Sequence, residues 1–197
     1  MVDRRILAAG AAALTALVAT GASAHPGHGV EASIASGFVH PFGGIDHILA
    51  MIGVGLWGAQ IGGRALWQLP LAFVAALLVG ALVGLGGAGL PAMEIGIAGS
   101  VAVLGLAVLF GAKVPAWVGF GVAALFGLFH GQAHGVEMPV AGSAASYIIG
   151  MVAATLVLHA VGATLGLAAR RSELRLVLRF GGAAIAVVGG LMLAGVA

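Results

Sequence analysis

The chain has 197 residues, of which 61% are hydrophobic and only 7% are charged. A soluble domain carries roughly 25% charged residues, so this composition excludes a water-soluble globular protein and indicates a polytopic membrane protein. Eight Lys and Arg against six Asp and Glu, without a basic run, argue against nucleic-acid binding, and the absence of Cys excludes disulfides and thiolate metal ligands.

Residues 1–24 have the three parts of a cleavable signal peptide. The positively charged start MVDRR is followed by the apolar stretch ILAAGAAALTALVAT and by the small residues ASA. Cleavage after Ala24 would make His25 the mature N-terminus; the alternative is an uncleaved first helix. Residues 25–34 would then form a periplasmic tail, in which His25 and His28 either capture a metal ion or simply belong to a solvated segment.

Six apolar segments after the leader are each long enough to cross a bilayer, which takes about 20 helical residues. No polar domain interrupts them, so residues 35–197 are predicted to form one all-α membrane domain with six transmembrane helices. The segments lie near residues 35–59, 67–86, 92–111, 115–136, 143–168 and 176–196.

The basic residues predict the orientation of this domain. With the mature N-terminus outside, every other loop faces the cytoplasm, and the outer loops hold no Lys or Arg. Such a positive-inside distribution predicts a multi-pass membrane protein with an external N-terminus, which in a bacterial inner membrane would be periplasmic. The basic residues of the inner loops and their flanks are Arg64, Lys113, Arg170, Arg171, Arg175 and Arg179.

Glycines spaced four apart predict how the helices pack. Gly127, Gly131 and Gly135 form the longest such rail, and small residues at this spacing let helix backbones approach closely within a membrane. The same rails would serve contacts within one chain or between copies, so the pattern is compatible with a monomer and with a homo-oligomer.

The fourth segment carries three polar residues that a lipid-embedded helix would normally avoid. His130, His134 and Glu137 fall on one helical stripe, since successive residues are about 100° apart. An intramembrane carboxylate costs roughly 2.5–3.5 kcal/mol and is normally paired or functional. No Lys or Arg lies at matching depth, so the expected partner is a cation from outside; the alternative is a hydrogen-bond network between helices.

The first segment carries a second polar set. His40 and His47 are two helical turns apart, and Asp46 directly precedes His47. Pro41 disfavours helix at the residue before it, and the glycines at 43–44 loosen the chain that follows. The sequence therefore predicts a broken or late-starting helix at this point.

Depth places both polar sets in the outer half of the bilayer. Glu94 opens the third segment at similar depth, where it either joins the pathway or caps the helix N-terminus.

Nitrogen and oxygen ligands without thiolate suit a borderline divalent ion such as nickel or cobalt. His159 stands alone nearer the inner side and is predicted to be a satisfied packing histidine, with an exit site for the ion as the alternative.

The motif HPFGGIDH at 40–47, followed by FHGQAHGVE at 129–137, resembles the HupE/UreJ family of nickel/cobalt permeases. The likeness covers essentially the whole chain, including a leader that ends just before HPGHG. It implies an ATP-independent permease with no resident cofactor, which imports Ni²⁺ or Co²⁺ for hydrogenase, urease or cobalamin. The positions that the resemblance assigns to the ion are His40, Asp46, His47, His130, His134 and Glu137, with Glu94 as the acidic residue of the third span.

Two other functions remain open at this point. An intramembrane zinc-dependent hydrolase would use similar histidines, but it would need an open coordination position and a general base. The chain has no His-Glu-x-x-His motif, and Glu137 follows the histidine pair instead of lying within it. The third alternative is a metal-free assembly or sensor subunit.

Overall fold

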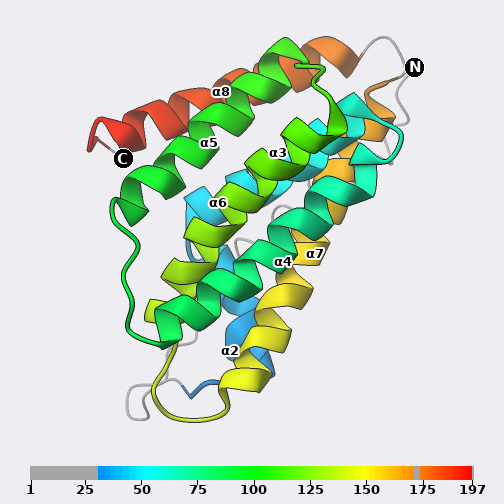
Figure 1. Cartoon of the computed structure of the whole chain (residues 1–197). Coiled ribbons are helices and arrows are strands. Elements are labelled where there is room, and N and C mark those ends of the chain that lie inside the picture. The colour runs from blue at the N-terminus through cyan, green and yellow to red at the C-terminus, as the bar shows by residue number, and fades with distance from the viewer. Residues whose placement is uncertain (1–30, 171–173, 197) are drawn as a thin grey trace. The chain divides into compact units, whose positions relative to one another are not determined.

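The computed structural model describes residues 31–170 and 174–196 (Figure 1). The predicted leader and the part of the predicted tail that carries His25 and His28 lie outside these residues. Within them the chain is helical, and its one β-type pairing is an isolated bridge between Ala32 and Gly142. The elements are α2 (Ile34–Val39), the 3₁₀ turn η1 (His40–Phe42), α3 (Ile45–Ile61), α4 (Ala65–Leu85), α5 (Met93–Phe110), α6 (Ala116–Val136), α7 (Ala144–Ala168) and α8 (Arg175–Leu193).

The predicted class of multi-pass helical membrane protein is confirmed. Five helices, α4 to α8, are each long and apolar enough to cross a bilayer, and a sixth span is reached if α2, η1 and α3 are counted together. This first span is bent: the part formed by α2 and η1 meets α3 at an angle of 85°, so the predicted segment 35–59 does not form one straight helix.

The bend at the start of α3 has a local cause in the sequence. Pro41 occupies the first turn of η1, and Gly44 has an extended backbone, with φ −116° and ψ 125°, at the N-cap of α3. Proline tolerates a first turn because its missing N–H is not needed there. The predicted break in the first segment is therefore confirmed, and it places His40 outside the helix that carries His47.

Helices α4 and α6 pack backbone to backbone along the predicted glycine rail. A Cβ atom at Gly131 would overlap the carbonyl group of Leu77, and one at Gly80 would overlap the carbonyl oxygen of Leu128. Gly127 and Gly135 face other α4 carbonyl groups in the same way. The rail therefore fixes α6, and with it the polar stripe, against α4.

Two further helix pairs use the same kind of contact. Gly55 of α3 faces the backbone at His159, and Gly162 of α7 faces the carbonyl oxygen of Ile52. Helices α5 and α8 approach each other through Gly105 and Gly182. The described residues thus form three close pairs, α4 with α6, α3 with α7, and α5 with α8.

Helix α2 is attached to α7 beside the bend. Gly37 and Gly150 each lie against a backbone carbonyl of the other helix. The chain before α2 is tied to the loop before α7, since the Ala32 N–H donates to the Ala141 carbonyl at 2.6 Å and the Ser143 N–H donates to the Ala32 carbonyl at 2.8 Å. These contacts hold η1, and therefore His40, in place.

The alternating directions of the helices give the bundle two chemically different ends. The end where α3 and α5 begin and α6 terminates carries His40, Glu94 and Glu137, and we call it the ligand end. The opposite end, where α3, α5 and α7 terminate and α8 begins, carries the basic residues Lys113 and Arg175, and we call it the basic end.

Candidate metal centre

Polar side chains from the two sequence motifs meet at the ligand end. His40, His47, His134 and Glu137 each offer a ligand atom, and these four atoms lie within 4.8 Å of one another. They come from η1, α3, α6 and the C-cap position of α6, so residues almost a hundred positions apart share one site. We call these four residues the ligand cluster.

The cluster is already held together by direct contacts. His40 Nε2–H donates to Glu137 Oε2 at 3.1 Å. The rings of His47 and His134 have centroids 4.4 Å apart, and those of His40 and His134 lie 4.9 Å apart. Three imidazoles and one carboxylate therefore face a common point without any change of backbone.

His134 is the most informative member of this cluster. Its side chain is fully buried, and neither ring nitrogen has a hydrogen-bond partner among the described residues. Buried polar groups in proteins are nearly always hydrogen-bonded, and an unsatisfied one costs roughly 1–3 kcal/mol. An imidazole left in this state beside two other histidines is suited to donating a lone pair to a metal ion.

His130 lies beneath the ligand cluster and contacts it through His47. The two Nδ1 atoms are 3.1 Å apart. Ser100 of α5 fixes the tautomer of His130: the Ser100 hydroxyl donates to the Ile97 carbonyl at 2.6 Å, so its oxygen accepts from His130 Nε2–H at 2.8 Å. Nδ1 of a neutral His130 is then an acceptor that faces the cluster.

A pocket of about 310 Å³ opens above the cluster. Its lining brings five of the predicted site residues together with four others: His40, Gly43, Gly44, Asp46, His47, Glu94, Ile97, Ala133 and Glu137. No Lys or Arg is part of this lining. The mouth of the cluster is therefore acidic, which favours the approach of a dication.

The two remaining predicted acids lie at this mouth and outside the ligand cluster. Asp46 accepts a hydrogen bond from the His47 backbone N–H at 2.8 Å, and its Oδ1 is 3.4 Å from His47 Nδ1. Glu94 lies in the first turn of α5, where the structure shows no side-chain cap for that helix. Both residues thus line the pocket. Asp46 lies beside His47, and Glu94 comes from the first turn of α5.

Glu137 follows the last residue of α6 and is the most exposed member of the cluster. The hydrogen bond from His40 lowers the pKa of Glu137, and this effect outweighs the opposing effect of its partial burial. The carboxyl group is therefore ionised at neutral pH and contributes a full negative charge at the mouth.

Sequence reasoning missed two side chains at this site. Ser100 gave no signal, because single small residues are common in packed membrane helices. Tyr147, the one tyrosine of the chain, lies with its ring 5.6 Å from that of His40 and is buried. Its place beside His40 depends on the packing of α2 against α7.

His159 is a packing residue, as predicted, but it is not satisfied. It is buried on α7 with its ring 5.1 Å from that of Phe73, and neither nitrogen has a partner among the described residues. The Phe73 ring also lies 5.6 Å from that of His130. An aromatic side chain thus stands beside both histidines, and His159 does not join the ligand cluster.

Replacement of Ser100 by Ala is expected to weaken metal binding by about tenfold, because Ser100 orients His130, which in turn contacts the cluster member His47, and groups that orient a metal-binding histidine have effects of about this size or larger. Titration of the purified protein with Ni²⁺ measures the change. Thr155→Val is the matched control, since the buried Thr155 hydroxyl bonds its own helix at Met151. Equal affinities of Ser100→Ala and the parent protein would contradict the assigned role.

Comparison with known proteins supports the family that the two histidine motifs indicate. Residues 12–193 match the family model described as HupE / UreJ protein. Protein HupE of Rhizobium leguminosarum bv. viciae is 43% identical over 176 residues, a match that covers 88% of this chain and 91% of that protein. No solved structure matches the chain. The match spans both histidine motifs and all the described helices, and the chain therefore belongs to the HupE/UreJ family.

Proposed function

We propose that this protein is a permease that imports Ni²⁺ or Co²⁺ through the ligand cluster. The observation that supports this most strongly is His134, a fully buried imidazole beside His40 and His47 that has no hydrogen-bond partner among the described residues. A transported dication would accept lone pairs from these rings. Imported nickel would supply hydrogenase or urease, and imported cobalt would supply cobalamin.

The donor set favours a borderline transition metal over the abundant hard cations. Three imidazoles and one carboxylate offer nitrogen-rich coordination without sulfur. Imidazole suits nickel, copper, zinc and iron, whereas magnesium and calcium prefer oxygen ligands. The ionised Glu137, with Asp46 and Glu94 at the mouth, offsets the charge of the ion as water is removed.

The proposed direction follows from the two ends of the bundle. The basic end faces the cytoplasm under the positive-inside rule, which puts the ligand end on the periplasmic side. An ion that enters the acidic pocket would therefore come from the periplasm. The predicted tail with His25 and His28 would begin on the same side and deliver ions to the pocket.

The membrane potential suffices to drive this import. An inside-negative potential contributes about 2.3 kcal/mol per charge for each 100 mV, which is about 4.6 kcal/mol for a dication. That energy supports more than a thousandfold accumulation, since about 1.4 kcal/mol corresponds to a factor of ten. The sequence contains no phosphate-binding Gly-x-x-x-x-Gly-Lys motif. The proposed import therefore uses the membrane potential and not ATP hydrolysis.

Liposomes that contain only this protein are expected to take up Ni²⁺ and Co²⁺ at a rate that rises with an inside-negative potassium diffusion potential. Mg²⁺ should not enter at a comparable rate, because it prefers oxygen ligands. Protein-free liposomes and liposomes at zero potential are the controls. Hydrolysis of peptide or ester substrates without metal flux would instead favour the zinc hydrolase, and the absence of both would favour a metal-free subunit.

A further inference from the structure

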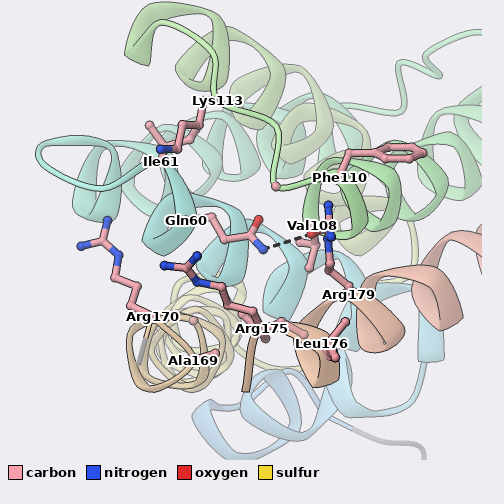
Figure 2. A pocket seen from close by; sticks show the side chains of 13 residues that line it. Gln60, Ile61, Val108, Phe110, Lys113, Ala169, Arg170, Arg175, Leu176 and Arg179 are labelled. Carbon is pink, nitrogen blue, oxygen red and sulfur yellow. Dashed lines mark hydrogen bonds between the residues drawn. The ribbon is translucent and has the colours of Figure 1, made fainter. Parts of the chain in front are cut away.

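A second pocket lies at the basic end, away from the ligand cluster. It has a volume of about 590 Å³, within the range of small-molecule sites, and is formed by the ends of α3, α5 and α7 and the start of α8 (Figure 2). Four cationic side chains line it: Lys113, Arg170, Arg175 and Arg179. We call it the basic pocket.

The arginines of the basic pocket are partly fixed by the protein. Arg179 Nε–H donates to the Leu109 carbonyl at 3.1 Å, which leaves the terminal guanidinium nitrogens available. The Arg170 guanidinium lies against Gly62, where a Cβ atom would overlap it. Arginine presents its donors in a planar fork that matches phosphate oxygens, so fixed guanidinium groups suit a phosphate ligand.

The described residues offer no carboxylate to neutralise this pocket. No acidic residue lines it, and both ion pairs found among the described residues, His40 with Glu137 and His47 with Asp46, lie at the ligand end. Like charges held close together repel each other unless a counterion binds between them. Within the described residues, which do not include Glu173, the lining of the basic pocket is therefore positively charged and suits an anion.

The side chain of Gln60 gives a second and independent indication of what the basic pocket binds. Its Nε2–H donates to the Val108 carbonyl at 3.0 Å, as Figure 2 shows, while its Oε1 is buried without a donor among the described residues. A buried acceptor of this kind is normally satisfied by a donor group. A ligand of the basic pocket that carries a hydroxyl group as well as a negative charge would supply this donor.

The rim of the pocket is apolar. Phe110 is 69% exposed and Leu176 is 63% exposed, and both line the opening beside the cations (Figure 2). These residues end α5 and begin α8, the helix pair that forms this side of the pocket. A charged pocket with an apolar rim at a membrane boundary matches a lipid headgroup with its acyl chains alongside.

We propose that the basic pocket binds the headgroup of an anionic, hydroxyl-bearing phospholipid of the inner leaflet, such as phosphatidylglycerol. The phosphate accepts hydrogen bonds from Arg175 and Arg179, and a glycerol hydroxyl donates to Gln60 Oε1. The acyl chains lie against Phe110 and Leu176. Basic pockets between transmembrane helices on the cytoplasmic side are known to suit anionic headgroups.

The test uses the full chain purified in neutral detergent, with bound lipid counted by native mass spectrometry. Phosphatidylglycerol is compared with phosphatidylcholine of the same acyl chains, and inorganic phosphate and glycerol phosphate are added as soluble competitors. Phosphatidylglycerol is expected to bind at least tenfold more tightly than phosphatidylcholine. Millimolar soluble phosphate should not displace it.

Variants assign the binding to the pocket. Arg175→Gln combined with Arg179→Gln should weaken phosphatidylglycerol binding by about 25-fold, since each cation near an anionic lipid contributes about fivefold. Arg175→Gln alone should weaken it about fivefold and serves if the double variant does not fold. Arg64→Gln removes the same charge at the same end from an exposed residue outside the pocket lining, and it should leave the affinity unchanged.

Three results would each overturn the proposal. Equal binding of the two lipids would remove the requirement for an anion, and an equal loss in Arg64→Gln would show general surface attraction instead of a site. Displacement of the lipid by inorganic phosphate would identify a pocket for a free anion. None of these measurements involves metal flux, so their outcome is independent of the proposed import activity.

Discussion

His47→Ala should abolish uptake of Ni²⁺ and Co²⁺ into liposomes, with a loss of at least about 100-fold. His47 has the central position of the site: its ring lies 4.4 Å from that of His134 and 5.0 Å from that of His130, and its Nδ1 is 3.4 Å from Asp46 Oδ1. Removing this imidazole deletes one of the four proposed ligands and also the contact that joins the cluster to His130.

The matched control is His159→Ala. This variant removes the same buried side chain from α7, the helix paired with α3, and leaves a cavity of similar size. His159 lies outside the ligand cluster, so uptake should stay within about twofold of the parent protein while both variants lose similar stability. Uptake by His47→Ala at the parent rate, or an equal loss in both variants, would contradict a ligand role for His47.

Gly131→Ala should destabilise the protein by about 1–3 kcal/mol, the usual cost of overpacking a core. The added Cβ would overlap the carbonyl group of Leu77, which is backbone and cannot rotate away. Helices α4 and α6 would have to separate, and His130 and His134, which flank the glycine, would move with α6. Thermal unfolding in detergent should therefore occur at a lower temperature, and metal affinity should fall.

Gly121→Ala on the same helix provides the comparison. A Cβ at Gly121 would meet no other atom within 4 Å, apart from its own chain neighbours and the nearby helix backbone. This variant should be neutral or slightly more stable, because alanine is favoured over glycine in a helix by about 1 kcal/mol. If Gly131→Ala were as stable as Gly121→Ala, the packing described for α4 and α6 would be wrong.

The sequence predicted those features that depend on local chemistry. The break in the first span follows from Pro41 and the glycines after it, and the stripe of His130, His134 and Glu137 follows from helical periodicity. Depth alone was enough to place both motifs at the same end, and the structure brings them into contact. That this site carries nickel or cobalt stays a prediction.

Features that depend on which helices become neighbours were not predictable. Ser100 contacts His130 only because α5 lies against both α3 and α6. Asp46 has a more peripheral place than its neighbour His47, since its carboxylate turns back to its own helix. The basic pocket likewise combines residues from four helix ends that no sequence pattern links.

The glycine contacts also determine how the ligands are distributed between rigid units. His40 and His47 belong to the α2–α3–α7 unit, whereas His134 and Glu137 belong to the α4–α6 unit. The cluster therefore lies across a seam between two tightly joined blocks. A small sliding of one block along the other would lengthen the distances from His40 and His47 to His134, while the glycine contacts inside each block remained intact.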